Sequence, residues 1–188
     1  MTKLIASIFC QLMLINSANA SELSEQLASP NYVLIMRHAR APGIGDPDRF
    51  SLDDCGTQRN LSDEGREQAR KVGLWLHQQN IQSALVVSSP WCRTKETGTL
   101  LNYGTAQPDS ALASFFDDPA SADSANIRLE QFIVNAVDQK HRRALILVTH
   151  EINIERWIGV SVAAAEMVLV HIDAHGKPLS HKVYPRPE

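Results

Sequence analysis

The sequence lacks any excess of basic residues. Its 188 residues include 18 Lys and Arg against 21 Asp and Glu. This balance excludes the basic surface that is typical of nucleic-acid-binding proteins, and it provides no long-range attraction for phosphorylated ligands. Any site for an anion must therefore consist of basic side chains that the fold brings together locally, and we expect no nucleic acid among the partners.

Long hydrophobic runs are also scarce, and the single long one is at the start of the chain. Residues 4–15 are apolar, Lys3 precedes them, and Ala18 and Ala20 follow with the small side chains that signal peptidase reads. The run is too short to span a bilayer, which needs about 20 apolar residues. The pattern predicts a signal peptide over residues 1–20, with a native N-terminal helix as the alternative. Cleavage would deliver residues 21–188 to the periplasm or the medium without a stable membrane anchor.

Cysteine is rare, and export would leave only Cys55 and Cys92. Their spacing resembles no zinc site, and no histidine has metal-ligand spacing alongside a carboxylate, so we expect neither a metal nor a cofactor. In an oxidising compartment the pair can form a disulfide, while the alternative is two small buried thiols. Both remain open because the sequence does not give the separation of their Cα atoms. A thiol-redox function is disfavoured by the absence of a Cys-x-x-Cys motif.

The chain does contain an alternation of buried strands and amphipathic helices. Continuous apolar runs suit strands buried on both faces, and the alternation predicts a single α/β domain, a three-layer sandwich with a largely parallel central sheet. We expect Ile127, Phe132, Ile133 and Val137 to face inward from one of the helices. The expected strands are 32–36, 84–87, 144–148, an edge strand within 106–112 and a closing hairpin of 167–172 and 179–184; the expected helices are 63–79, 91–101, 124–138 and 152–158.

Basic residues occur where three of the predicted strands end. Arg37 and His38 follow the first buried strand, Arg93 lies in the first turn of the helix after the second, and His150 ends the third. Ligands of parallel sheets bind outside the carboxyl ends of the strands, so these side chains should converge. Arginine binds phosphate oxygens in pairs, and nearby positive charge keeps a histidine unprotonated. An unprotonated His38 can attack phosphorus and form a phosphohistidine.

Four segments resemble motifs of the histidine phosphatase (phosphoglycerate mutase-like) superfamily, and they occur in that family's order. The resemblance implies an α/β sandwich in which His38 is the phosphorylated nucleophile, while Arg37, Arg93 and His150 complete the phosphate pocket. The superfamily includes small exported phosphatases. The segments are Leu34-Ile35-Met36-Arg37-His38, the run 60–69 beginning Asn60-Leu61-Ser62, Ser88-Ser89-Pro90-Trp91-Cys92-Arg93-Thr94, and Val148-Thr149-His150.

The sequence departs from the family pattern at Ala39, and it does not identify which residue is the general acid. Ala39 stands where the family usually has glycine, and its methyl group is expected to alter the shape of the pocket. The general acid that protonates the leaving oxygen is Glu151, beside His150, or else Asp117 or Asp118. Among these three candidates, Glu151 is slightly preferred.

Two polar loops, 39–60 and 113–123, are expected to form the rim of the pocket and to set specificity. Arg40 and Arg59 flank the first loop and are candidates for contacts with the non-phosphate part of a substrate. Both loops are rich in acids, which would disfavour substrates with many phosphates unless the acids fold outward. These acids are Asp46, Asp48, Asp53 and Asp54 in the first loop, and Asp117, Asp118 and Asp123 in the second.

The sequence therefore predicts an exported, metal-independent phosphomonoesterase. Its expected substrate is a small phosphorylated compound, such as a sugar phosphate, and its expected state is a monomer. Two alternatives remain. One is a phosphotransferase or mutase, which export disfavours; the other is a non-catalytic module that keeps the pocket for binding phosphate.

Overall fold

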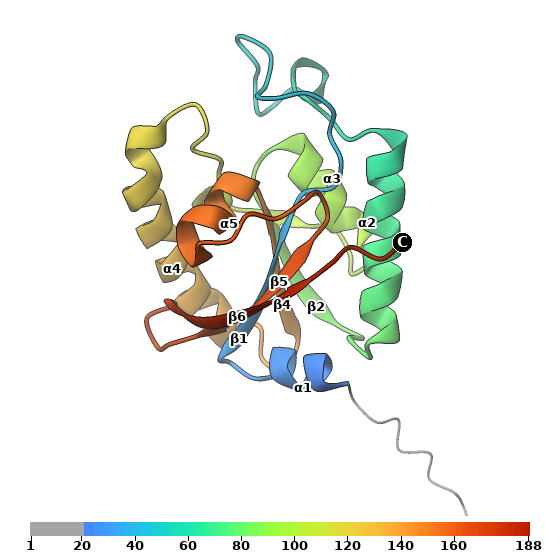
Figure 1. Ribbon diagram of the computed structural model, residues 1–188, viewed down its shortest axis with the longest axis vertical. Coiled ribbons are helices and arrows are strands. Elements are labelled where there is room, and N and C mark those ends of the chain that lie inside the picture. The colour runs from blue at the N-terminus through green and yellow to red at the C-terminus, as the bar shows by residue number, and fades with distance from the viewer. Residues whose placement is uncertain (1–20) are drawn as a thin grey trace, which may run out of the picture.

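The computed structural model describes residues 21–188, and the signal peptide expected over residues 1–20 lies outside this range. Six strands form one sheet in the order β3-β2-β4-β1-β5-β6 (Figure 1). The pairs β3–β2, β2–β4 and β4–β1 are parallel, whereas β5 and β6 add an antiparallel edge, which confirms the predicted sheet. The strands are β1 (Tyr32–Arg37), β2 (Ala84–Ser88), β3 (Gln107–Pro108), β4 (Ala144–Thr149), β5 (Met167–Ile172) and β6 (Pro178–Tyr184).

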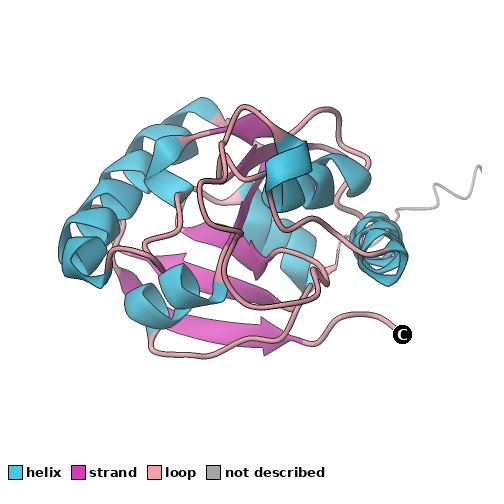
Figure 2. Ribbon diagram, turned by 90° about the horizontal axis from the view of Figure 1, so that it is seen from above, coloured by secondary structure: helices cyan, strands magenta, loops and turns pink. Residues whose placement is uncertain are grey.

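Helices cover both faces of the sheet and complete the predicted three layers (Figure 2). Residues of α1, α2 and α3 pack on one face, and residues of α4 and α5 pack on the other. Within residues 21–188, no helix combines the length and apolarity needed to cross a membrane. The helices are α1 (Glu22–Ala28), α2 (Asp63–Gln78), α3 (Cys92–Leu100), α4 (Ala122–Gln139) and α5 (Glu151–Ile158).

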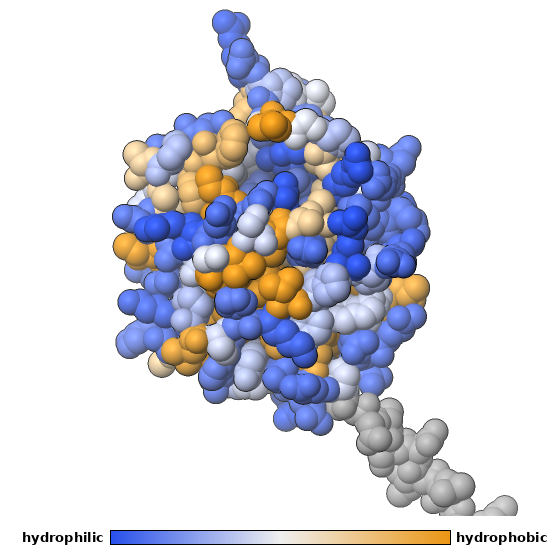
Figure 3. All heavy atoms as spheres, viewed as in Figure 1, coloured by the Kyte–Doolittle hydropathy of each residue, from blue (hydrophilic) through white to orange (hydrophobic). Residues whose placement is uncertain are grey.

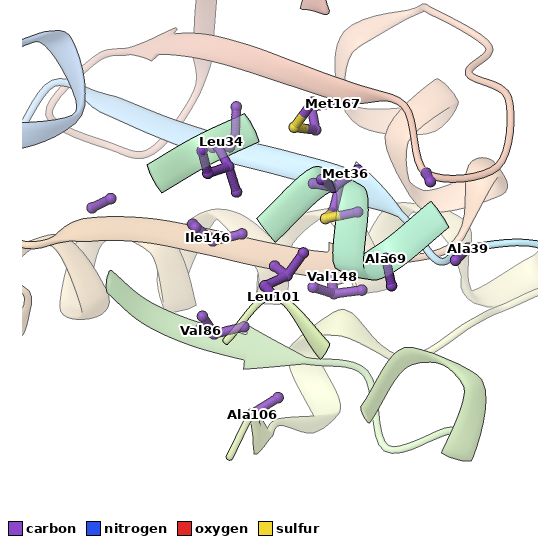
Figure 4. Packing of buried hydrophobic residues seen from close by; sticks show 14 of the residues in the cluster. Leu34, Met36, Ala39, Ala69, Val86, Leu101, Ala106, Ile146, Val148 and Met167 are labelled. Carbon is purple, nitrogen blue, oxygen red and sulfur yellow. The ribbon is translucent and has the colours of Figure 1, made fainter. Parts of the chain in front are cut away.

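The central strands divide their side chains between these two layers. In β1, Leu34 and Met36 join the core under α2 and α3, whereas Val33 and Ile35 join the core under α4 and α5. All four are fully buried, as expected for a strand covered on both faces. Figure 4 shows Leu34 and Met36 packed with residues of the neighbouring strands and helices. This packing fixes the end of β1, from which Arg37 and His38 emerge.

The helix α2 begins where its sequence predicts. The side chain of Ser62 accepts a hydrogen bond of 3.1 Å from the backbone N–H of Gly65, which is the usual role of an N-cap serine. Ala69, Val72 and Leu76 form its fully buried face. Gly65 lets the first turn pack against the loop after β1, because a Cβ there would collide with the backbone carbonyl of Arg40.

Three expectations about individual elements were wrong. The helix α1 was not expected. The edge strand within 106–112 is reduced to the two residues of β3 and is followed by a 3₁₀ helix, Ser110–Leu112. On α4, the inward position expected for Ile127 is instead 54% exposed. The buried positions on α4 are Ala125, Leu129, Ile133 and Ala136, with Phe132 and Val137 packed beside them.

Candidate active site

A pocket of about 340 Å³ lies at the carboxyl ends of the parallel strands, beneath the loop 39–60 at the top of Figure 1. Basic side chains from three strand ends meet there, as the sequence predicts. The ends of β1 and β4 supply Arg37, His38 and His150, α3 supplies Arg93, and α5 supplies Glu151 and Glu155. The loop 39–60 supplies Ile44, Asp46 and Arg59, and the remaining lining includes Trp91, Phe116 and Asp117.

His38 is buried, and its imidazole is held in one orientation. Its Nδ1 lies 2.8 Å from the backbone oxygen of Ala39. Since a carbonyl oxygen can only accept a hydrogen bond, Nδ1 carries the proton and Nε2 keeps its lone pair. Burial, together with the charges of Arg93, Arg59 and Arg37, lowers the pKa of His38 to about 3, against the opposing effect of the Ala39 hydrogen bond. His38 is therefore neutral at physiological pH, as a nucleophile must be.

His150 lies beside His38 and is equally buried. The two ring centroids are 5.5 Å apart, and Nε2 of His150 is 2.8 Å from the hydroxyl oxygen of Ser89. Burial, together with the neighbouring His38 and Arg93, holds the pKa of His150 well below its ordinary value. The pocket thus contains two uncharged imidazoles, one of which is fixed by a buried serine.

Arg93 and Arg37 provide donors that the protein leaves without partners. Arg93 is 3% exposed, and its Nη1 contacts Asp46 Oδ1 and Oδ2 at 2.9 and 3.1 Å. The Nη1 atom of Arg37 lies 2.9 Å from the backbone oxygen of Val162 and 2.5 Å from Glu151 Oε2. The buried Nε atoms of both arginines have no hydrogen-bond partner within residues 21–188. Buried donors need acceptors, and the oxygens of a phosphoryl group would supply them.

Residues 33–113 match the model of the histidine phosphatase superfamily (branch 1). The match includes Arg37, His38 and Arg93, whose convergence the geometry shows independently. Over these residues the chain is similar to the histidine phosphatase superfamily. No curated protein sequence matches it.

Several solved structures share the fold. Phosphoserine phosphatase from Entamoeba histolytica, in complex with 3-phosphoglyceric acid, aligns with a TM-score of 0.58 and 15% identity over 80% of this chain and 95% of its own. A mycobacterial glucosyl-3-phosphoglycerate phosphatase in complex with inorganic phosphate aligns with a TM-score of 0.56 and 13% identity over 82% of this chain and 95% of its own. The protein histidine phosphatase SixA, complexed with tungstate, aligns with a TM-score of 0.51 and 20% identity over 81% of this chain and 94% of its own.

The two arginines that flank the loop 39–60 differ in position. Arg59 lines the pocket, where its Nε lies 2.7 Å from the backbone oxygen of Gly45. Arg40 does not line the pocket; its half-exposed side chain pairs with Glu64 at 3.1 Å. The structure therefore places Arg40 outside the pocket in which it was expected. Because the backbone of Arg40 packs against the start of α2, its side chain is directed to that helix.

Asp46 is the functional candidate that the sequence did not single out. It was expected on the rim with the other loop acids, but its side chain is 4% exposed and lies inside the pocket. It accepts hydrogen bonds from the backbone N–H of Arg59 at 2.9 Å and from Trp91 Nε1 at 3.0 Å, besides Arg93. Burial raises the pKa of Asp46, but these hydrogen bonds and the Arg93 charge outweigh it and hold the pKa below its ordinary value. Asp46 is therefore a carboxylate among the arginine donors of the pocket.

The structure places the candidates for the general acid and Ala39 relative to the pocket. Glu151 and Asp117 line the pocket, whereas Asp118 does not. Ala39 does not line it either. Its methyl group is fully buried in the core cluster that also contains Met36 (Figure 4), so it does not project into the pocket.

The Cys55–Cys92 disulfide is formed, with Cα atoms 5.7 Å apart. It joins the loop 39–60 to the first residue of α3, next to Arg93. A second tie lies beside it, because the backbone N–H of Cys92 donates to Gln58 Oε1 at 2.9 Å. Among residues 21–188, no group of three or more His, Cys, Asp and Glu side chains is arranged to hold a metal ion.

Proposed function

We propose that residues 21–188 form an exported phosphomonoesterase that hydrolyses small phosphorylated compounds through a phosphohistidine on His38. The observation that carries this proposal is the neutral, buried imidazole of His38, whose unprotonated Nε2 lies among the charges of Arg37, Arg59 and Arg93. Similarity to the histidine phosphatase superfamily over residues 33–113 supports phosphatase activity.

In the first step, the phosphoryl oxygens would accept hydrogen bonds from Arg37 and Arg93, whose Nε donors are buried without protein partners in the described chain. Nε2 of His38 would attack phosphorus in line with the leaving oxygen, so that an N–P bond forms while the ester P–O bond breaks. The arginines would offset the charge that spreads over the phosphoryl oxygens in the transition state.

The leaving oxygen requires a proton, which we assign to Glu151. Its carboxylate lines the pocket beside His150, contacts Arg37, and accepts a 2.5 Å hydrogen bond from Ser161. Asp117, which also lines the pocket, is the second candidate.

In the second step, a water molecule would attack phosphorus on the phosphohistidine. The N–P bond breaks, and its electrons return to Nε2 of His38. The water loses its proton to the carboxylate that protonated the leaving group, and inorganic phosphate dissociates. The pocket would thereby return to the neutral His38 from which it began.

The substrate is proposed as a sugar phosphate or another simple phosphomonoester. Structural relatives with the same fold are named for small phosphorylated substrates, phosphoserine and glucosyl-3-phosphoglycerate. The location is proposed as periplasmic or extracellular, from the pattern of residues 1–20. Cell fractionation of the full chain and N-terminal sequencing would test this: a retained, uncleaved chain would contradict export.

The proposed function predicts that residues 21–188 hydrolyse a generic aryl phosphate in EDTA, whereas His38→Ala abolishes turnover. A second substrate, an alkyl phosphate, tests the acid: Glu151→Gln should slow the alkyl ester far more than the nitrophenyl ester, whose leaving group needs little protonation. If His38→Ala keeps full activity, the nucleophile is wrong. If neither protein hydrolyses any ester but both bind inorganic phosphate, residues 21–188 form a non-catalytic phosphate-binding module.

A further inference from the structure

Asp46 stands apart from the other acids of the loop 39–60 because it is the one that the loop folds inward. Gly43 and Gly45 adopt positive φ angles of 95° and 66°, which are accessible mainly to glycine, and they turn the chain so that the next residue enters the pocket. Arg59 donates to the Gly45 carbonyl and holds this turn. The loop therefore has a defined conformation that delivers one carboxylate to the phosphate-binding donors.

The contact between Asp46 and Arg93 fixes the direction of the arginine. Both carboxylate oxygens accept from Nη1, and Nη1 also lies 3.4 Å from the backbone oxygen of Arg59. Because the guanidinium group is planar, fixing Nη1 fixes the direction of Nε. This Nε is buried and has no partner among residues 21–188, which leaves it available to a phosphoryl oxygen.

The same carboxylate also changes the charge that a bound phosphate meets. Asp46 contacts Arg93 and the backbone of Arg59, and its pKa is held below the ordinary value, so it is negative whenever the enzyme works. A negative charge beside the arginines weakens their attraction for a phosphate dianion, and it does so strongly because the side chain is withdrawn from water. Inorganic phosphate, the product of the proposed reaction, would dissociate more readily.

We propose that Asp46 is the positioning residue of Arg93, which orients the guanidinium for phosphoryl transfer and moderates its hold on phosphate so that the product leaves. The proposal rests on the proposed phosphatase function for its catalytic half. A residue that only anchored the loop would stabilise the fold. Its replacement would not lower kcat while tightening the binding of phosphate.

The test compares Asp46→Asn with Asp48→Asn, which removes an equal charge from an exposed position of the same loop. Within residues 21–188, Asp48 makes no side-chain hydrogen bond or ion pair, so it is a matched control. For Asp46→Asn we expect kcat for an aryl phosphate to fall roughly 10- to 100-fold, the scale of a misoriented catalytic group. The Kd of inorganic phosphate, measured by calorimetry, should fall several-fold. Asp48→Asn should change neither.

Two further measurements distinguish a lost orientation of Arg93 from a lost charge at Asp46 and from a failure to fold. The Nε–H resonance of Arg93 should be resolved in the NMR spectrum of the wild type and broadened in Asp46→Asn. Asp46→Glu keeps the charge but displaces it by one methylene, so it should lower kcat without tightening phosphate binding. It also serves as the second variant if Asp46→Asn does not fold.

An unchanged kcat in Asp46→Asn would show that Arg93 needs no positioning by Asp46. A phosphate Kd that rises together with a lower melting temperature would reduce Asp46 to an anchor of the loop. Either result overturns the proposal. If the wild type hydrolyses no ester, the proposed function fails, but phosphate calorimetry and the Arg93 resonance still decide whether Asp46 orients the guanidinium and weakens its hold on phosphate.

Discussion

At the scale of single residues, the pocket combines charged arginines with imidazoles that burial keeps neutral. His38 and His150 are each 4% exposed, and the pKa of each is lowered chiefly by burial. The arginines remain charged at any working pH. Such a site can bind an anion and attack it at the same time, since the nucleophile does not share the positive charge of its neighbours.

These buried histidines make the folded state sensitive to acid. The pKa of His38 is about 3 in the folded protein, against 6.5 for an unperturbed histidine. Between these values the unfolded chain takes up a proton that the folded chain does not, so the free energy of unfolding should decrease as the pH falls from about 6.5 towards 3. Urea unfolding at pH 7, 6, 5 and 4 would measure this decrease, and His38→Gln should give a shallower dependence on pH. Parallel curves for the two proteins would mean that His38 titrates normally.

The sequence predicted residues at strand ends better than residues in loops. His38 and Arg93 could be placed because a buried strand or a helix start fixes each backbone position, and parallel strands bring their ends together. Asp46 could not be placed, because its entry into the pocket depends on two left-handed glycines and on Arg59, which is distant in sequence. Arg40 was misplaced because its direction depends on packing against α2, which local sequence does not encode.

At the scale of elements, long periodic segments were predicted well and short ones were not. The central strands and α2 have a repeating apolar pattern that only one structure satisfies. The seven residues of α1 show little period; its signal is the N-cap Ser21 with Leu23 and Leu27 one turn apart. Pro108 has no N–H to donate, which accounts for the early end of β3. On α4, Ile127 is exposed because the buried residues are three or four positions apart and form one face of the helix, from which position 127 points away.

The disulfide is the element-scale feature with the clearest expected effect. It closes a segment of 37 residues, and the chain-entropy argument gives a stabilisation of about 4 kcal/mol for a loop of this length. Cys55→Ala/Cys92→Ala should therefore lower the free energy of unfolding by an amount approaching this value. The variant should also raise KM, because the loop that carries Asp46 and Arg59 loses its tie to α3.

Denaturant unfolding with and without dithiothreitol would measure this effect. The reductant should destabilise the wild type to the level of the double variant and should leave the double variant unchanged. If dithiothreitol changes the free energy of unfolding of both proteins equally, the disulfide makes no measurable contribution to stability. The hydrogen bond from Cys92 to Gln58 would then be what holds the loop to α3.

At the scale of the whole molecule, three arginines form a small basic cluster in the pocket of a protein whose net charge is negative, and acids line the same pocket. Lys3 is the only charged residue among the first twenty, so residues 21–188 carry 17 Lys and Arg and 21 Asp and Glu, a net charge of −4. The outer wall of the pocket includes Asp117 and Glu155, and also two exposed hydrophobic residues, Ile44 and Phe116. In Figure 3, hydrophobic and hydrophilic residues are mixed over the face of the molecule that the view shows. In the proposed function, a substrate would meet the basic groups at its phosphoryl group.

This distribution predicts discrimination by substrate charge. A sugar monophosphate satisfies the arginines at the base of the pocket, whereas a second phosphate would lie against the acids of the wall, where repulsion is only partly screened by salt. We expect kcat/KM for a sugar bisphosphate to be roughly tenfold or more below that of the matching monophosphate, since tenfold corresponds to about 1.4 kcal/mol.

Two acids of the pocket wall can be neutralised to test this expectation. Asp117→Asn/Glu155→Gln should reduce the ratio of kcat/KM between monophosphate and bisphosphate. Added salt should reduce this ratio less in that variant than in the wild type. Asp48→Asn/Asp53→Asn removes the same charge away from the pocket and should leave the ratio unchanged. Equal rates for the two sugars in the wild type would mean that the rim acids turn away from bound substrate, and specificity would then have to arise from Ile44 and Phe116.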